Sequence, residues 1–367
     1  MDPSNWPTIS FAALGKGTGV SWPYIEQVKN QFNWSRLDEF VNLANTHGVS
    51  IMFSERGVPP WAAADRSTCH SQPPFGRYCS SAVSDIGDWE NFVTALVTRY
   101  KGRNQIYELW NEPQTSFTGT LAQFVALTQH EHDIIRSIDP TATILSPSTV
   151  SYGSQYLDSY FAAGGTTDID AVAMHAYPDP SNDIAETVTT SMTTTILSVM
   201  SKYGLKDKPL WDTEGSWGYA TAGAITDSNL RAAFVARYYL LHWSVGISRV
   251  YWYGWDNADI GNLWSSRGGP AEAAVAYTQV YNWMQGAVMA RPCSSNGARS
   301  PYSAVYTCDL TRSGGYQARA VWKTDGSSTY VAPKTFTVYR DLAGNKVSIP
   351  SKQEVPIGLK PILLETF

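Results

Sequence analysis

The sequence predicts an α/β protein, a (β/α)8 TIM barrel whose first strand is not readable, followed by a small C-terminal antiparallel β-sandwich domain. First, apolar strand-like runs alternate with helical stripes, a pattern typical of a parallel sheet with right-handed crossovers. Second, two strands end in a glutamate, Glu112 and Glu214, and a closed parallel barrel brings such strand ends together. Third, from about residue 287 the pattern changes to period-two strands and glycine-rich turns, which is typical of antiparallel sheets.

The length of the chain fits this division. It has 367 residues, and α/β barrels often run to about 250 residues as one unit. We therefore expect the barrel over residues 1–286 and the β-sandwich domain over residues 287–367. The net charge of −5 argues against nucleic acid or an anionic membrane as a partner. No apolar run reaches the roughly 18 residues needed to span a bilayer.

Hydrophobic periodicity places the elements in chain order. The first helix falls within 32–47, with Ser35 as its N-cap, and the helix over 89–100 has Asp88 as its cap. Further helices are expected around 124–138, 156–162, 186–203 and 230–245. Strands are expected at 9–14, 49–53, 106–112, 143–146, 169–175, 210–214 and 248–253, and in the C-terminal part at 304–310, 317–323, 335–339 and 361–365.

The run from residue 106 is a short apolar strand that ends in Asn111, Glu112 and Pro113. Residues two apart in a strand share a face, so Glu108 and Glu112 point the same way. Proline has no N–H group and ends the pairing. The strand at 210–214 repeats this design, with a glutamate before a glycine-rich turn. Paired carboxylates at strand ends are the equipment that glycoside hydrolysis requires.

Each of these acids also has a structural interpretation. A single strand-end glutamate is often a helix cap or an ion-pair partner, and the two motifs together favour catalysis. We expect Glu108 to be an ion-pair partner inside the barrel, and Asp212 to support Glu214 from the same face. His130-Glu131-His132 is not expected to bind a metal, because residues two apart on a helix diverge and a zinc pair prefers a four-residue spacing.

These motifs resemble the retaining glycoside hydrolases of clan A, and the likeness is closest to family 39 with its β-xylosidase-like and exopolysaccharide-cleaving relatives. The resemblance extends over most of residues 11–285. Besides Asn111-Glu112-Pro113 and Thr213-Glu214-Gly215, it rests on Phe32-Asn33-Trp34 with Leu37-Asp38, Pro59-Pro60-Trp61, His175-Ala176-Tyr177 and Tyr251-Trp252-Tyr253.

The resemblance implies hydrolysis of β-linked oligo- or polysaccharides by double displacement, with Glu112 as acid/base and Glu214 as nucleophile, and without a cofactor or a metal. Asn111 would bind the sugar 2-hydroxyl, although an Asn before such a turn can also be a turn former. The other implied substrate contacts are His175, Tyr177, Trp61, Trp252 and Trp255, and for each of them packing in the core is the alternative.

The chain departs from the family pattern at its N-terminus. Five residues precede Trp6, too few for the strand that the family has there. The family also places an arginine beside the nucleophile after the next strand, where this chain has Gly15-Lys16-Gly17-Thr18, and a lysine does not replace a bidentate guanidinium. These departures motivate the alternative of a carbohydrate-binding protein with impaired catalysis. A related enzyme alternative is a transglycosylase, in which an acceptor sugar replaces water.

The four cysteines form two local pairs, Cys69 with Cys79 and Cys293 with Cys308. Neither pair has the spacing of a zinc or redox site, so we expect two disulfides and an oxidising compartment; four reduced thiols are the alternative. The protein is then expected to be secreted or periplasmic, with its signal peptide absent from this sequence. In the C-terminal domain, Trp322 and Tyr330 suggest sugar binding, against the simpler interpretation of a structural appendage.

Overall fold

The computed structural model describes residues 1–15, 17, 19–103, 105–150, 153–178, 184–218, 225–297 and 300–366. Lys16 lies outside the described residues. The chain forms two compact units. The first comprises residues 1–6, 11–175 and 195–214, and the second comprises residues 7–10, 176–194 and 215–367.

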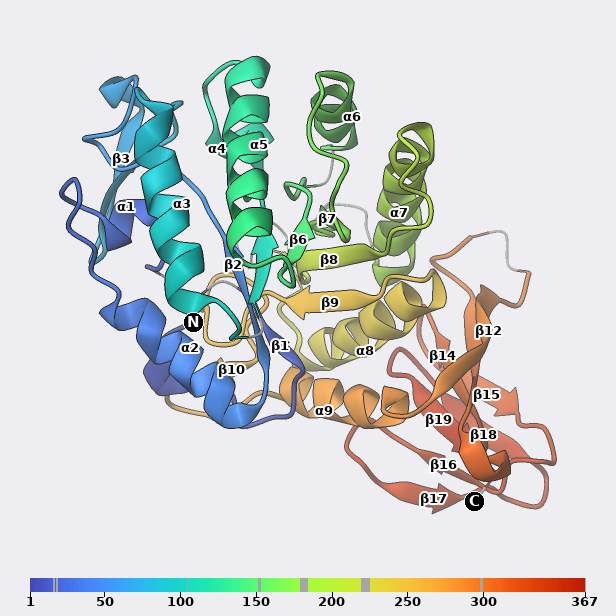
Figure 1. Ribbon diagram of the computed structural model, residues 1–367. Helices are drawn as coiled ribbons and strands as arrows, with labels where there is room; N and C mark the ends of the chain where they lie inside the picture. Colours follow the sequence, from blue (N-terminus) through green and yellow to red (C-terminus); the bar gives the residue numbers. More distant parts are fainter. Residues whose placement is uncertain are drawn as a thin grey trace. The chain divides into compact units, whose positions relative to one another are not determined.

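The first unit is built on parallel strands that alternate with helices (Figure 1). Strands β1 (Ala13–Leu14), β2 (Ser50–Ser54), β5 (Gln105–Glu108) and β6 (Thr143–Leu145) pair in that order, and every pairing is parallel. Strand β7 (Val172–Met174) pairs in parallel with β8 (Leu210–Gly215). A parallel bridge from Leu145 to Ala171 joins the two sets. The predicted fold class, a (β/α)8 barrel, is confirmed.

The connecting helices follow the predicted order, while some of their ends differ from the prediction. They are α2 (Ser35–His47), α3 (Ile86–Tyr100), α5 (Leu121–Ile138), α6 (Ser154–Ala162) and α7 (Ala185–Lys202), with two short helices α1 (Trp22–Ile25) and α4 (Pro113–Ser116).

Two of the predicted helix caps are wrong. Asp85, rather than Asp88, caps α3, because its carboxylate accepts a hydrogen bond from the backbone N–H of Gly87 at 3.0 Å. Asp88 instead pairs with Lys29. Ser35 is the first residue of α2, and Trp34 occupies the N-cap position.

Strand β1 is shorter than predicted. Residues 9–14 were expected to form a strand, but only Ala13 and Leu14 pair, with Ser50 and Ile51 of β2. Helices α3 and α5 bury an aromatic core next to these strands. Trp89 is fully buried, and its ring lies 6.1 Å from that of Trp110.

The second unit contains β9 (Arg249–Trp252), α8 (Ser228–Ser244), α9 (Glu272–Met284), the short pair β10 (Trp264–Ser265) and β11 (Gly269–Pro270), and the C-terminal antiparallel sheets. The larger sheet has the order β12-β13-β14-β19-β16-β17. Strands β15 and β18 form a second, two-stranded sheet. The two sheets contribute to one hydrophobic core, which includes Val321, Phe336, Val355 and Leu364. The strands are β12 (Val288–Ser295), β13 (Val305–Thr311), β14 (Gln317–Lys323), β15 (Ser328–Val331), β16 (Val338–Arg340), β17 (Lys346–Ser348), β18 (Glu354–Ile357) and β19 (Ile362–Glu365).

Trp322 of β14 is a structural residue. It is fully buried, and its indole Nε1–H donates to Glu186 Oε1 of α7 at 2.7 Å. Arg237 of α8 lies 3.4 Å from the same oxygen. Because the indole is enclosed in this way, it presents no face to a sugar. Tyr330 is half-buried, and its hydroxyl accepts from Arg319 at 3.1 Å.

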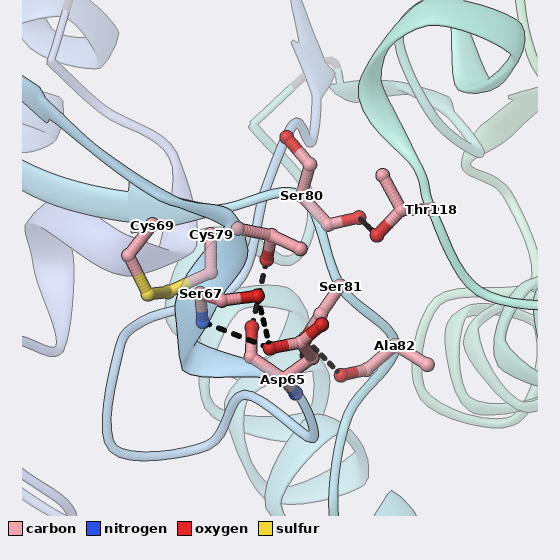
Figure 2. Close-up of a disulfide and its surroundings, with 9 residues drawn as sticks. Asp65, Ser67, Cys69, Cys79, Ser80, Ser81, Ala82 and Thr118 are labelled. Atoms are coloured by element: carbon pink, nitrogen blue, oxygen red, sulfur yellow. Dashed lines mark hydrogen bonds between the residues drawn. A yellow bond between two sulfur atoms is a disulfide. The ribbon is translucent and has the colours of Figure 1, made fainter.

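Both predicted disulfides are present. Cys69 and Cys79 face each other across the antiparallel pair β3 (Cys69–Gln72) and β4 (Gly76–Cys79), as Figure 2 shows. Cys293 and Cys308 join β12 to β13. In the part of the chain that the structure describes, no helix is both long and apolar enough to span a membrane.

Candidate active site

Glu112 lies on a tight turn beyond the end of β5. Its backbone has φ 51° and ψ 58°, in the left-handed region that side chains other than glycine rarely adopt. Pro113 begins helix α4 directly afterwards, and the backbone N–H groups of Thr115 and Ser116 both donate to the Glu112 carbonyl at 3.0 Å. The strand was predicted to run to residue 112, but β5 ends at Glu108, so Glu112 lies on the turn that follows the strand.

Glu214 sits near the end of β8 in regular strand conformation. Asp212 lies on the same face of the strand and is fully buried, whereas the Glu214 side chain keeps 16% of its surface exposed and that of Glu112 keeps 14%. The two glutamates are therefore the acids that solvent or a ligand reaches.

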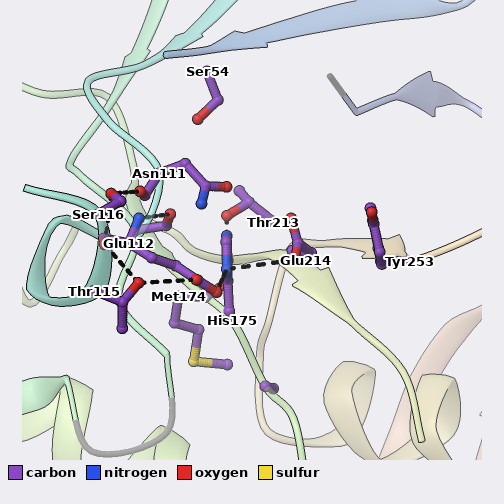
Figure 3. Close-up of polar contacts among 12 residues, drawn as sticks. Ser54, Asn111, Glu112, Thr115, Ser116, Met174, His175, Thr213, Glu214 and Tyr253 are labelled. Atoms are coloured by element: carbon purple, nitrogen blue, oxygen red, sulfur yellow. Dashed lines mark hydrogen bonds and ion pairs between the residues drawn. The ribbon is translucent and has the colours of Figure 1, made fainter. Parts of the chain in front are cut away.

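His175, just after β7, lies between the two glutamates (Figure 3). Its Nδ1 is 2.7 Å from Glu112 Oε1 and 4.0 Å from Glu214 Oε1. One ligand atom from each of the three side chains lies within 4.8 Å of the others. The structure thus brings together two acids and a histidine that come from three separate strands and that the sequence singled out.

Burial and charge act in opposite directions on His175. The ring is 1% exposed, and burial by itself lowers the pKa of an imidazole. The charge of Glu214, the hydrogen bond to Glu112 and the charge of Glu108 outweigh this, so the pKa of His175 is raised above its ordinary value. In its protonated form the ring donates its Nδ1–H to Glu112 and neutralises part of the negative charge between the acids.

Glu108 is buried against two serine hydroxyls. This carboxylate is 1% exposed, and its Oε1 accepts hydrogen bonds from the hydroxyls of Ser54 at 2.6 Å and Ser148 at 2.9 Å. Among the described residues no lysine or arginine forms an ion pair with it. The ion-pair role therefore stays a prediction, and the contacts that the described residues provide are two neutral hydroxyls from neighbouring strands.

Ser54 and Ser148 were not singled out from the sequence. Each follows or ends a parallel strand, Ser54 at the end of β2 and Ser148 after β6. A polar residue at the carboxyl end of a barrel strand is the signal that would have found them. Asn111 is buried, and its backbone N–H donates to the Glu55 carbonyl at 2.9 Å.

The aromatic candidates have mainly packing contacts. Trp61 is half-buried: its indole donates to the Glu26 carbonyl at 2.8 Å, and Lys29 Nζ lies 5.6 Å from the ring centre. In the second unit, Trp252 donates to the Gly261 carbonyl at 2.7 Å, and Trp255 is 8% exposed.

Tyr177 also belongs to the second unit and is half-buried. The Glu112, His175 and Glu214 cluster lies entirely within the first unit. The substrate contacts predicted for Tyr177 and for the three tryptophans stay predictions.

Within the described ranges, one cluster of side chains has the residue types and spacing that could hold a metal ion. The same three side chains, Glu112, His175 and Glu214, form the one group of three or more potential ligands there. A cation held through His175 Nδ1 would replace the hydrogen bond between His175 and Glu112, because a ligating ring nitrogen carries no proton. His130 and His132 contact different elements, with His130 on Glu90 and His132 on the Asp168 carbonyl.

The parallel barrel strands and the paired acids at their ends define a class, the retaining glycoside hydrolases of clan A, and comparison with known proteins agrees. Residues 14–258 match the family model described as Cellulase (glycosyl hydrolase family 5). The chain belongs to this family, and its substrate is a carbohydrate. The predicted clan is confirmed, and the matching family model is that of family 5.

Solved structures of similar fold include members of family 39. A family 39 β-xylosidase from Caulobacter crescentus has a TM-score of 0.67 and 14% identity, over 99% of this chain and 90% of that one. The family 39 enzyme from Xanthomonas axonopodis pv. citri has a TM-score of 0.65 and 12% identity, over 99% and 89%. A family 44 xyloglucanase from Paenibacillus polymyxa has a TM-score of 0.58 and 11% identity, over 96% and 93%. At these identities the likeness concerns the fold.

Proposed function

We propose that the protein is a retaining β-glycosidase that hydrolyses β-linked oligo- or polysaccharides, with Glu214 as nucleophile and Glu112 as acid/base. The observation that carries the proposal is the meeting of the two carboxylates across His175, with one oxygen of each within 4.8 Å of the other. Retaining enzymes hold their two carboxyl groups about 5–5.5 Å apart, whereas inverting enzymes leave room for a water between them.

The reaction proceeds in two displacements. Glu214 attacks the anomeric carbon while the bond to the leaving oxygen breaks, and Glu112 donates its proton to that oxygen. Glu112 then removes a proton from water, the water oxygen attacks the anomeric carbon, and the bond to Glu214 breaks. His175 binds Glu112 Oε1, and the Thr115 hydroxyl lies 3.4 Å from Oε2, the oxygen to which we assign the proton transfer. Its positive charge stabilises the Glu112 carboxylate that forms after the proton has left.

The remaining assignments rest on the resemblance and on the disulfides. Asn111 binds the sugar 2-hydroxyl, and Tyr177, Trp61, Trp252 and Trp255 contact the substrate. Two disulfides indicate an oxidising compartment, which supports a secreted or periplasmic location. The catalytic barrel comprises residues 1–286, and the β-sandwich domain comprises residues 287–367.

Mechanism-based labelling tests the proposal. The protein is incubated with activated 2-deoxy-2-fluoro-β-glycosides of several sugars, and its intact mass is measured. We expect one fluoroglycosyl group per chain, located on Glu214 by peptide mapping, and no label on Glu214→Gln.

Three results would contradict the proposal or refine it. Oligosaccharide binding without labelling or turnover would support a non-catalytic carbohydrate-binding protein. Label on a residue other than Glu214 would contradict the assigned nucleophile. Transfer of the glycosyl group to added sugars in preference to water would identify a transglycosylase.

A further inference from the structure

Glu108 is a buried acid that the two displacements leave without a role. It is the last residue of β5, four positions before Glu112, and it is 1% exposed. One of its oxygens accepts from Ser54 and Ser148, and within the described ranges the other, Oε2, has no hydrogen-bond partner. A buried carboxylate with so few partners is costly to keep. Its contacts show what it holds in place.

Ser148 connects this carboxylate to the turn that carries Glu112. The Ser148 hydroxyl donates to Glu108 Oε1 at 2.9 Å. The backbone N–H of Glu112 donates to the Ser148 carbonyl at 3.2 Å and is 3.4 Å from its hydroxyl oxygen. The Ser148 N–H in turn donates to the Trp110 carbonyl at 2.9 Å. Ser148 therefore holds the chain on both sides of Asn111.

The conformation of Glu112 explains why such support is needed. A glutamate in the left-handed region is intrinsically unfavourable, and it persists only where surrounding contacts fix the backbone. Ser54 makes the matching hydrogen bond to Glu108 from β2, but in the described part of the chain its hydroxyl forms no hydrogen bond to the Glu112 turn. Both serines thus donate to the same oxygen of Glu108, and Ser148 also hydrogen-bonds the Glu112 turn.

We propose that Glu108 and Ser148 are positioning residues for the acid/base: Glu108 fixes the Ser148 hydroxyl, and Ser148 holds the left-handed turn that aims the Glu112 carboxyl at the leaving oxygen. This inference rests on the proposed function. It predicts a selective defect in proton donation, because misplacing the acid harms only those substrates whose leaving group needs protonation.

Ser148→Ala and Ser54→Ala form a matched pair, since each removes one hydroxyl donor to Glu108. For each variant kcat/KM, which reports the first displacement, is measured with two aryl β-glycosides of a sugar that the wild type hydrolyses. One carries a good leaving group, 2,4-dinitrophenol, and the other a poor one, phenol. We expect Ser148→Ala to lower kcat/KM about 10- to 100-fold on the phenyl glycoside and less than about threefold on the dinitrophenyl glycoside. Ser54→Ala is expected to change both by less than about threefold.

A second pair of variants tests Glu108 itself. Glu108→Gln retains an oxygen that accepts from both serines, so it should stay close to the wild type in its leaving-group dependence. Glu108→Leu has no acceptor and should reproduce the pattern of Ser148→Ala. Thermal unfolding of all four variants identifies any that are not folded at the assay temperature, and the pattern is judged on the folded ones from either pair.

Two outcomes overturn the inference while leaving the proposed function intact. One is an equal loss on both glycosides for Ser148→Ala, which would indicate general disturbance of the site. The other is an equal selective loss for Ser54→Ala, which would show that contact with the turn is irrelevant. A wild-type protein that hydrolyses no glycoside in the labelling panel contradicts the proposed function, and the inference falls with it.

Discussion

The first unit buries carboxylates in two regions with different surroundings. At the strand ends, His175 contacts both Glu112 and Glu214. The hydroxyls of Ser54 and Ser148 donate to Glu108. Inside helix α5, Glu131 is 3% exposed, and its Oε2 has no hydrogen-bond partner in the part of the chain that the structure describes. Burial first, and then the charge of Glu55, raise the pKa of Glu131 well above the usual range of a carboxyl group.

This difference shows that burial alone does not make an acid suitable for catalysis. Burial raises the pKa of Glu131 and so favours its neutral form, and the residue forms part of the packing of α5. Glu112 and Glu214 have His175 as a shared partner, so one of them can attack as an anion while the other exchanges a proton. Four variants test this distinction, starting from the strand ends.

The largest expected effect comes from Glu214→Gln. Removing the nucleophile should lower kcat by at least about ten-thousandfold on every glycoside that the wild type hydrolyses, because no covalent intermediate forms. Initial-rate assays with an aryl glycoside measure this. The control is Glu131→Gln, a buried acid outside the cluster, which should keep wild-type activity; equal losses in the two variants would remove the distinction between the regions.

Glu112→Gln should affect proton transfer alone. We expect kcat/KM to fall about 100- to 10,000-fold on glycosides with poor leaving groups and far less on a dinitrophenyl glycoside, whose leaving group departs without an acid. A Brønsted plot over a series of phenols measures this dependence. A uniform loss across the series would contradict the assignment of Glu112 as the acid.

His175→Gln should have a smaller effect, with a characteristic pH dependence. Loss of a charge-assisted hydrogen bond of about 1.5–3 kcal/mol corresponds to a fall in kcat/KM of about 10- to 100-fold. Because the folded protein raises the pKa of His175, its protonation stabilises the fold. That stabilisation is complete below the ordinary value of about 6.5 and is lost as the pH rises through the raised pKa.

Urea unfolding at a series of pH values measures the stability of the wild type and of His175→Gln. Their difference in unfolding free energy should be largest in mild acid and should shrink in the alkaline range. A difference that grows with pH would mean that the histidine is neutral in the folded protein.

Glu131→Gln should give the smallest effect, and it concerns stability. A carboxyl group with a raised pKa binds its proton more tightly in the folded state, so the wild type loses stability as the pH rises from the ordinary carboxyl range towards the raised value. The amide does not ionise, so at neutral pH the variant should be more stable, by on the order of 1 kcal/mol. Thermal unfolding at acidic and neutral pH measures this; a variant less stable at neutral pH would show that Glu131 is charged and partnered.

The sequence predicted the parts of the site that depend on local pattern. Alternating strands and helices placed Glu112, His175 and Glu214 at strand ends, and a parallel barrel then had to bring them close together. The partners of Glu108 were not predictable in the same way. Ser54 and Ser148 reach it from other strands, and pairing register, which a single sequence does not display, decides which hydroxyl meets which acid.

The fold shows the same division between local and distant determinants. Periodicity located α3 and α5, but α9 and β12 were not expected, and the cap of α3 was misplaced by three residues because Asp85 and Asp88 are both plausible caps in sequence. Asp88 contacts Lys29, a residue far away along the chain, while Asp85 accepts the capping hydrogen bond from Gly87. Sequence pattern gives the elements, and contacts between distant segments determine their ends.

The hydrogen bond from Trp322 to Glu186 has a consequence for dissecting this enzyme by truncation. Cutting the chain before β12 would remove the indole donor and leave an acid on α7, together with neighbouring Arg237, facing water or an empty space. A shortened protein would therefore contain a buried acid that has lost its hydrogen-bond donor. A loss of activity could then result from this defect, so it would not show that the removed strands bind sugar.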